Sequence, residues 1–351
     1  MPDFHGFSLP VNLLLFAAAA ALVWLAGTRL SAYVDEVAHR TGASEALLGA
    51  LLLGGITSLP EGATTVAASA VGNAPLAVNN ILGGIAMQVT VLALADLVAP
   101  GRALSARIRS SVVLLEGAVL IAVLTVVAAG MAVGDVLVAG VGVWSAAVLC
   151  AAVWGFRLIQ QHKSEGTWTA EAEASGDPPR EEGEGAAPHR RYRAHSATRL
   201  WISTGGAALA ILVAGVVLAH TGDALSEQSG IGANFVGVLF LAFATSLPEI
   251  STTIAAVRLG QVAMAFSNIF GANILDASIL FLADVAFPGG PVLNQVDASS
   301  LVASLLGIGT TSVYLVGLLR RRRRVVLGAG LDSLLVLAVY ATGLAILYRM
   351  R

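Results

Sequence analysis

The chain is poor in charge and in cysteine. Only 12% of its 351 residues are charged, about half the usual share for a soluble domain. The single cysteine, Cys150, lies in an apolar run, which excludes a disulfide framework and a thiolate metal cluster. The first ten residues contain no basic segment before the apolar run, so we expect no cleaved signal peptide. No metalloprotease motif, cofactor motif or paired nucleophile and base is present. We therefore expect neither enzymatic activity nor a bound cofactor.

What the chain does contain is long apolar runs, and 56% of its residues are hydrophobic. A transmembrane helix needs roughly 20 apolar residues. Hydropathy on that criterion predicts ten spans: 9–28, 45–71, 75–98, 110–130, 134–157, 199–219, 232–257, 262–286, 297–319 and 328–348. We therefore predict an all-α, multi-pass protein of the plasma membrane, which contacts the lipid bilayer and no nucleic acid.

The basic residues are distributed unevenly among the loops between these spans. Of the 20 lysines and arginines, 18 lie in loops that follow odd-numbered spans, and Arg349 and Arg351 end the chain. The positive-inside rule places those loops in the cytoplasm and both termini outside. The stretch 159–198 is polar and rich in Glu, Gly and Pro, which predicts a cytoplasmic linker.

The pentapeptide TSLPE occurs twice, at 57–61 and at 245–249. An offset of 188 aligns residues 51–96 with 239–284 without a gap, and 20 of these 46 positions are identical. Five spans separate the copies, so the second crosses the membrane in the opposite direction. This predicts a 5+5 inverted-topology repeat. The N-terminal five-helix repeat is 1–158, with its core at about 45–98, and the C-terminal repeat is 199–351, with its core at about 232–286.

The proline in each copy predicts a discontinuous helix, because it lacks the N–H that a helix needs. The breaks are expected near Thr57 and Thr245, which leaves carbonyl oxygens unpaired beside Glu61 and Glu249. An ionised carboxylate inside a membrane span costs at least roughly 2.5–3.5 kcal/mol. Backbone carbonyls that have lost their helical hydrogen bond are tolerated where they line a cavity or bind something. The alternative is a proline kink in which neighbouring hydroxyls satisfy each glutamate.

Hydroxyl and carboxyl residues recur on one face of each TSLPE helix, and a polar stripe continues on the next span. The predicted metal ligands are Glu61, Glu249, Thr57, Thr245, Ser58, Ser246, Asp276 and Gln88. Such an oxygen-only set suits Ca2+, and Na+ is also plausible. The six histidines lie in loops or at span ends, which disfavours Zn2+ and Cu2+. Asp96 and Asp284 are predicted as helix-end or interfacial residues, and Glu116 as a structural residue.

The segments GITSLPE, FATSLPE and NIFGANILD (268–276) resemble the α-repeats of the sodium/calcium exchanger group in the Ca2+/cation antiporter superfamily. The resemblance implies a 5+5 inverted-repeat fold and alternating-access exchange of Ca2+ for a monovalent cation. It also implies a role for each predicted ligand: carboxylates from Glu61 and Glu249, carbonyls from Thr57 and Thr245, hydroxyls from Ser58 and Ser246, and a central polar cluster with Asp276 and Gln88.

The counter-ion stays open at this point. Gly84 and Ala272 stand where the family has serines that help to hold Na+. The expected activity is Ca2+/Na+ antiport, with an H+-coupled divalent-cation antiporter as the alternative and a cation channel as a less favoured one. The sequence leaves open the selectivity between Ca2+ and Mn2+, the stoichiometry, the direction of transport, and the oligomeric state, for which a monomer is allowed.

Overall fold

The computed structural model describes residues 4–41, 48–99, 103–108, 110–162, 196–228, 243, 245–320, 325–326 and 329–350. Eleven α-helices lie within these residues. They are α1 (Leu9–Thr41), α3 (Gly55–Thr57), α4 (Leu59–Ala70), α5 (Ala74–Val98), α6 (Ser111–Val133), α7 (Val143–His162), α8 (Ala197–Gln228), α10 (Leu247–Arg258), α11 (Val262–Ala286), α12 (Ala298–Arg320) and α13 (Leu331–Met350).

Shorter elements join these helices. A π-helix, η2 (Gly49–Gly54), precedes α3, and three 3-10 helices are η1 (Phe4–Gly6), η3 (Leu104–Arg107) and η4 (Val292–Gln295). Two antiparallel hairpins pair β1 (Leu137–Val138) with β2 (Val141–Gly142), and β3 (Val325–Val326) with β4 (Ala329–Gly330).

Eight of the helices are long and apolar enough to cross a membrane: α1, α5, α6, α7, α8, α11, α12 and α13. This confirms the prediction of an all-helical, multi-pass protein. The two other predicted spans, 45–71 and 232–257, contain the TSLPE motifs. The first consists of η2, α3 and α4, and of the second the structure describes α10. Residues 229–242, and most of the predicted linker 159–198, lie outside the described residues.

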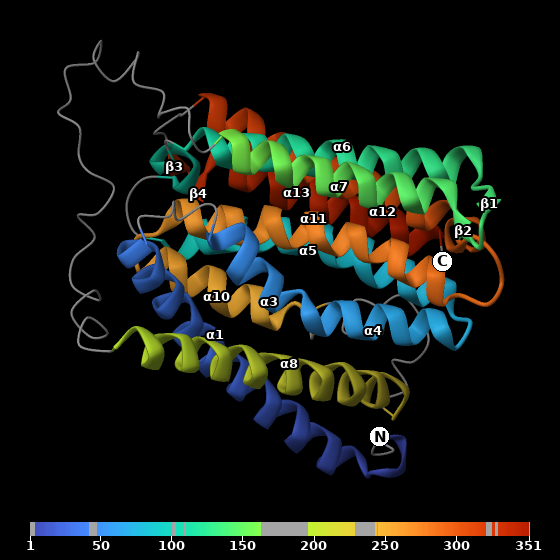
Figure 1. The fold of residues 1–351 in the computed structure, drawn as a ribbon, viewed down its shortest axis with the longest axis horizontal. Coiled ribbons are helices and arrows are strands. Elements are labelled where there is room, and N and C mark those ends of the chain that lie inside the picture. Colours follow the sequence, from blue (N-terminus) through green and yellow to red (C-terminus); the bar gives the residue numbers. More distant parts are fainter. Residues whose placement is uncertain are drawn as a thin grey trace.

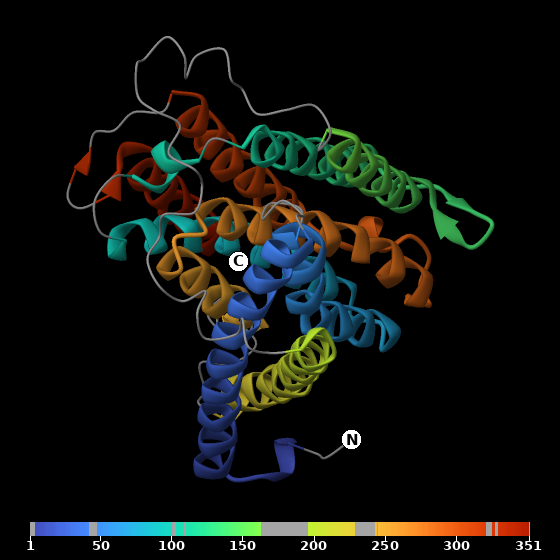
Figure 2. The ribbon, with the colours of Figure 1, turned by 60° about the vertical axis from the view of Figure 1, so that its left-hand side comes forward.

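The helices form three groups around a central pair (Figure 1). Helices α5 and α11 lie side by side in the middle and run in opposite directions. On one side they are covered by α6, α7, α12 and α13, and on the other side η2, α4 and α10 pack against α11. Helices α1 and α8 form a separate pair that projects from the rest of the molecule in Figure 2 and contacts it through α10, α4 and α3.

Polar side chains lie inside this bundle and large apolar side chains lie on its surface. Among the latter, Leu14, Ile202 and Trp154 are 71%, 69% and 62% exposed, whereas carboxyl, amide and hydroxyl side chains line the contacts of α4, α5, α10 and α11. A soluble protein would bury the first group and expose the second. The distribution fits a protein whose surface faces lipid.

The element bounds recur along the chain with the same offset of 188 residues that aligns the two TSLPE motifs. The pairs that begin and end at matching positions are α4 and α10, α5 and α11, η3 and η4, β1 and β3, β2 and β4, and α7 and α13. The structural correspondence therefore extends well beyond the 46 aligned positions, to the last helix of each half.

The first helix is longer than predicted. Hydropathy ends that span at residue 28, but α1 continues to Thr41. Two acidic residues in the added turns are buried and bonded: Gln261 donates its amide to Asp35 Oδ1 at 2.7 Å, and Glu36 pairs with Arg40 at 2.6 Å. A hydropathy window scores such residues as loop, because their hydrogen-bond partners do not enter the score.

Candidate functional site

The first TSLPE motif interrupts a helix, as predicted, and in the second motif a helix begins at the equivalent position. Helix α3 ends at Thr57, Ser58 forms a turn, and α4 begins at Leu59. In the second copy Ser246 is the N-cap and α10 begins at Leu247. The prolines fall in the first turn of α4 and α10, where their missing N–H leaves no intrahelical bond unmade. The interruption also places Glu61 and Glu249 in the first turns of these helices, where the helix dipole favours negative charge.

The structure brings all eight predicted ligands into the space between α3, α4, α5, α10 and α11. Each of them is at most 3% exposed. Residues from the two halves meet directly: Ser246 bonds Glu61, and Ser58 Oγ lies 3.5 Å from the carbonyl oxygen of Ala272. Asn273 Nδ2 lies 3.5 Å from the carbonyl oxygen of Ile85, its own counterpart at the offset of 188. The site therefore lies at the contact between the N-terminal and the C-terminal half of the chain.

The carboxylate of Glu61 is held by donors from both halves. Gln88 Nε2 donates to its two oxygens at 3.0 and 3.2 Å, and Ser246 Oγ donates to Oε1 at 2.9 Å. Gly84, on α5 one turn before Gln88, is also close, since a Cβ at that position would lie 3.6 Å from Glu61 Oε1. A side chain at position 84 would therefore reach the carboxylate directly.

The carboxylate of Glu249 is not held in this way. Neither of its oxygens has a hydrogen-bond partner among the described residues, and the same is true of Asp276 Oδ1. Glu249 interacts electrostatically with Glu61 and Asp276, and Thr57 also contacts it. Asp276 interacts in turn with Ser58, Glu61 and Gln88. Bare carboxylate oxygens in a dry interior are strongly unfavourable unless a cation or a proton compensates them.

Two further unpaired polar atoms beside these carboxylates are acceptors too. Gln88 Oε1 and Asn273 Oδ1 have no hydrogen-bond partner within the described part of the chain. Hard cations such as Ca2+ are bound by several oxygen ligands of this kind. However, no three acidic, histidine or cysteine side chains of the described residues are arranged to hold a metal ion. The predicted ligands are gathered in one place, and there the Glu61 carboxylate is bonded to Gln88 and Ser246.

Two asparagine amides, which the ligand prediction did not include, extend the site along α4 and α10 through hydrogen bonds to threonine hydroxyls. Asn80 Nδ2 donates to Thr65 Oγ1 at 3.1 Å, and Asn268 Nδ2 donates to the hydroxyls of Thr252 and Thr253 at 3.0 Å each. The repeat itself carries the signal for them, because Asn80 and Thr65 recur at the offset of 188.

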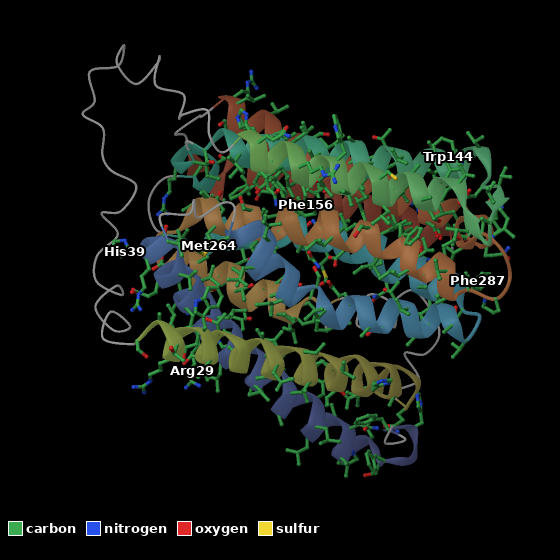
Figure 3. The ribbon with its side chains drawn as sticks, viewed as in Figure 1. Arg29, His39, Trp144, Phe156, Met264 and Phe287 are labelled. Atoms are coloured by element: carbon green, nitrogen blue, oxygen red, sulfur yellow. The ribbon has the colours of Figure 1, made fainter. Side chains whose placement is uncertain are left out.

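The backbone of α11 packs directly against the backbone of η2. A Cβ at Gly54 would lie 2.8 Å from the backbone nitrogen of Ala272, and a Cβ at Gly271 would lie 2.4 Å from Ala50 Cα. Figure 3 shows the long axis of the bundle, with His39 and Met264 toward one end and Trp144 and Phe287 at the other. The glycine contacts thus place α11 against η2 without an intervening side chain.

A comparison with known proteins identifies the family. The family model described as sodium/calcium exchanger protein matches residues 11–160 and 199–349. The chain belongs to this family. The two matched ranges are separated by residues 161–198, which nearly coincide with the predicted linker, and the family resemblance stated from the TSLPE motifs is confirmed.

Individual relatives support the same conclusion. The chain is 28% identical to the inner membrane protein YrbG of Escherichia coli (strain K12) over 271 residues, which are 76% of this chain and 77% of the relative. It is 28% identical to the putative antiporter CaxA of Alkalimonas amylolytica over 131 residues, 36% of this chain and 40% of that one.

A solved structure shows the fold. The sodium-calcium exchanger NCX_Mj, soaked with Na+ and Sr2+, superposes with a TM-score of 0.71 at 16% identity, over 96% of this chain and 99% of that chain. Together with the eight apolar helices, family membership makes this chain a multi-pass membrane protein of a cation-antiporter family, and a transporter rather than an enzyme.

Proposed function

We propose that the chain is a secondary active antiporter that exchanges Ca2+ for Na+ across the plasma membrane by alternating access. The observation that carries the proposal is the state of Glu249 and Asp276. Three of their carboxylate oxygens are buried beside Glu61 without a hydrogen-bond donor among the described residues. A hard cation is the ligand that such oxygens need.

The proposed ligands are the eight predicted residues, and Ca2+ lies between Glu61 and Glu249. For Ca2+ to bind, the Gln88 side chain rotates so that Oε1 replaces Nε2 beside the ion, which frees the Glu61 oxygens that the amide now occupies. Ser58 and Ser246 supply hydroxyls, Thr57 and Thr245 supply carbonyls, and Asp276 completes the negative charge. No resident cofactor takes part, and Ca2+ and Na+ are the substrates.

The proposed architecture has ten spans in two inverted halves, 1–158 and 199–351, joined by the linker 159–198. The matching element bounds at an offset of 188, and the opposite directions of α5 and α11, support it. By the positive-inside rule the linker is cytoplasmic and both termini are outside. Substrate sites of inverted-repeat transporters lie near the midplane at the repeat interface, and the contacts of Glu61 with residues of both halves support a site of this kind.

Charge compensation explains why such a site exchanges ions rather than leaks them. Glu61, Glu249 and Asp276 would bring up to three negative charges into a dry interior, so the unoccupied site is unfavourable in a closed state. Occupancy by Ca2+, or by several monovalent ions, offsets that charge. The transition between inward-open and outward-open states therefore requires an ion in each direction.

Proton coupling is the second candidate, and one observation favours it. Position 84 is adjacent to the Glu61 carboxylate but is glycine, and Ala272 is its counterpart. Neither residue offers a side-chain oxygen for a Na+ ion, whereas a carboxylate can take a proton without further ligands. Ca2+ uptake into proteoliposomes, driven either by a Na+ gradient or by a pH gradient, decides between the two. Uptake that responds to pH alone would exclude the Na+-coupled form.

The glutamates themselves provide the decisive variants. We expect Glu61→Gln and Glu249→Gln to abolish gradient-driven Ca2+ exchange, because each removes a charged ligand but keeps the side-chain shape. Glu116→Gln is the matched control: Glu116 is equally buried, but among the described residues its carboxylate is hydrogen-bonded to Ser267 and to none of the predicted ligands. Exchange that survives in Glu61→Gln or Glu249→Gln would contradict the proposed site, and Ca2+ flux without any counter-ion would identify a channel.

A further inference from the structure

Two asparagine amides lie beyond the carboxylates, in positions related by the offset of 188. Asn80 on α5 contacts Thr65, and Asn268 on α11 contacts Thr253. Each threonine follows the glutamate of its own motif by four residues, which corresponds to about 6 Å along a helix axis. Each amide therefore lies about one helical turn from a carboxylate, outside the set of predicted ligands.

The hydrogen bonds fix which way the Asn268 amide is turned. The Thr252 hydroxyl has one hydrogen and donates it to the carbonyl oxygen of Pro248 at 2.9 Å. It therefore accepts from Asn268, which must present Nδ2 to it at 3.0 Å. Asn268 Oδ1 is then turned away from the threonines. It has no partner among the described residues, although the side chain is fully buried.

Asn80 contacts one threonine instead of two, and its amide is turned the same way in the structure. Its Nδ2 is bonded to Thr65, its Oδ1 has no partner among the described residues, and the residue is only 3% exposed. A buried carbonyl oxygen without a donor is unfavourable, and here the same unpaired atom occurs in both halves. A buried amide oxygen without a hydrogen-bond donor is a ligand for a hard cation.

The two amides lie on opposite sides of the carboxylates. Helices α4 and α10 leave the centre of the molecule in opposite directions (Figure 1). Asn80 lies toward the end at which the turn with Gly72 joins α4 to α5, and Asn268 lies toward the end at which Gly260 joins α10 to α11. Buried polar groups continue past each amide, namely Ser69 at the first end and Gln261 with Asp35 at the second.

We propose that Asn80 Oδ1 and Asn268 Oδ1 are two transient binding stations for a partly dehydrated hard cation, one on each access route to the carboxylates. Each amide oxygen, with its threonine behind it, replaces part of the hydration shell before the ion reaches Glu61 and Glu249. The proposal rests on the proposed cation exchange, and it adds sidedness: each station serves the face on its own side of the centre.

The test measures the half-saturating Ca2+ concentration at each membrane face, in right-side-out and inside-out vesicles. Asn80→Leu is expected to raise this concentration on the order of tenfold at one face only, the effect of one lost ligand. Asn268→Leu is expected to do so at the opposite face only. Asn79→Leu is the matched control, because Asn79 Oδ1 already accepts from Ser300 Oγ at 2.7 Å.

A second pair of variants guards against loss of folding. Asn80→Asp and Asn268→Asp keep the size of the side chain, and the hydroxyls of Thr65 and Thr253, respectively, can donate to the new carboxylate. They are expected to lower the half-saturating Ca2+ concentration at the same face that the leucine variant of that position affects. Equal changes at both faces, or no change at either face in folded variants, would overturn the stations and leave the exchange activity standing. A wild-type protein without ion exchange would overturn both proposals.

Discussion

Asp96 of the first half bonds to Gly330 of the second half. Its Oδ2 accepts from the Gly330 backbone N–H and from the Ser333 hydroxyl, both at 2.7 Å, while Oδ1 accepts from Leu104 N at 2.7 Å. The equivalent contact lies at the other end of the bundle, where Asp284 accepts from Gly142 N and Val292 N, both at 2.6 Å. Each aspartate therefore ties the end of a central helix to the hairpin of the opposite half.

These two contacts predict a loss of stability on substitution. In Asp96→Asn one acceptor oxygen becomes an N–H group that faces another donor. We expect the free energy of unfolding to fall by about 2 kcal/mol, the range for a hydrogen bond to a charged group. Asp284→Asn is expected to act equally, and the double variant additively, because the two sites are far apart. Thermal unfolding of the purified protein in detergent measures the effect.

The matched control for these variants is Asp297→Asn. The Asp297 side chain is bonded to Ser299, two residues along the chain, and not to another element. A change within about 0.5 kcal/mol is expected there. If Asp96→Asn were as mild as Asp297→Asn, the bond to Gly330 would not hold the two halves together.

Gly271 on α11 lies against the backbone of η2, whereas Gly206 on α8 is exposed. A Cβ at Gly271 would lie 2.4 Å from Ala50 Cα and 2.9 Å from the Ala50 carbonyl oxygen, whereas at Gly206 no atom of the described residues lies within 4 Å. Gly271→Ala is therefore expected to destabilise the protein by about 3 kcal/mol, since backbone must move. Gly206→Ala is expected to be neutral or stabilising by up to about 1 kcal/mol, because alanine favours the helix. Equal unfolding temperatures in the two variants would contradict this packing.

The sequence predicts what is local or repeated. A proline disturbs its own helix, so the interruption at Ser58 and the start of α10 after Ser246 follow from the residues themselves. The offset of 188 relates equivalent positions without any knowledge of the fold. The polar stripe around Glu61 and Glu249 follows from helical periodicity, and the structure places these residues together.

What the sequence does not predict depends on long-range contacts. The π-helix η2 lies against α11 through glycine contacts that no local pattern reveals. The continuation of α1 to Thr41 depends on Gln261, more than 200 residues away. Asp96 and Asp284 are predicted as helix-end residues, but their bonding to the opposite half requires the tertiary arrangement.

Glu116 and Ser267 form a buried pair outside the proposed site. The Ser267 hydroxyl donates to Glu116 Oε2, and both residues are fully buried between α6 and α11. Ser267→Ala leaves the carboxyl group without this donor, so we expect a loss of about 1–3 kcal/mol in the free energy of unfolding. Ca2+ exchange per folded molecule is expected to be unchanged. A selective loss of exchange at wild-type stability would instead place Glu116 in the transport machinery.

The pair Gln88 and Asp276 breaks the symmetry of the site, because the two positions are equivalent in the repeat but only one is charged. Asp276→Gln leaves two carboxylates, and we expect it to lose Ca2+ exchange by about 100-fold or more, since a divalent cation is then poorly compensated. Gln88→Asp brings the number of carboxylates to four, and it is expected to bind Ca2+ more tightly and to turn over more slowly, because release becomes harder. The double variant restores three carboxylates and places the third on α5. If the number of charges governs exchange, the double variant recovers at least tenfold over Asp276→Gln in the same proteoliposome assay.

Each single variant serves as the reference for the other in this cycle. A double variant as inactive as Asp276→Gln would show that the position of the third carboxylate matters more than the total charge.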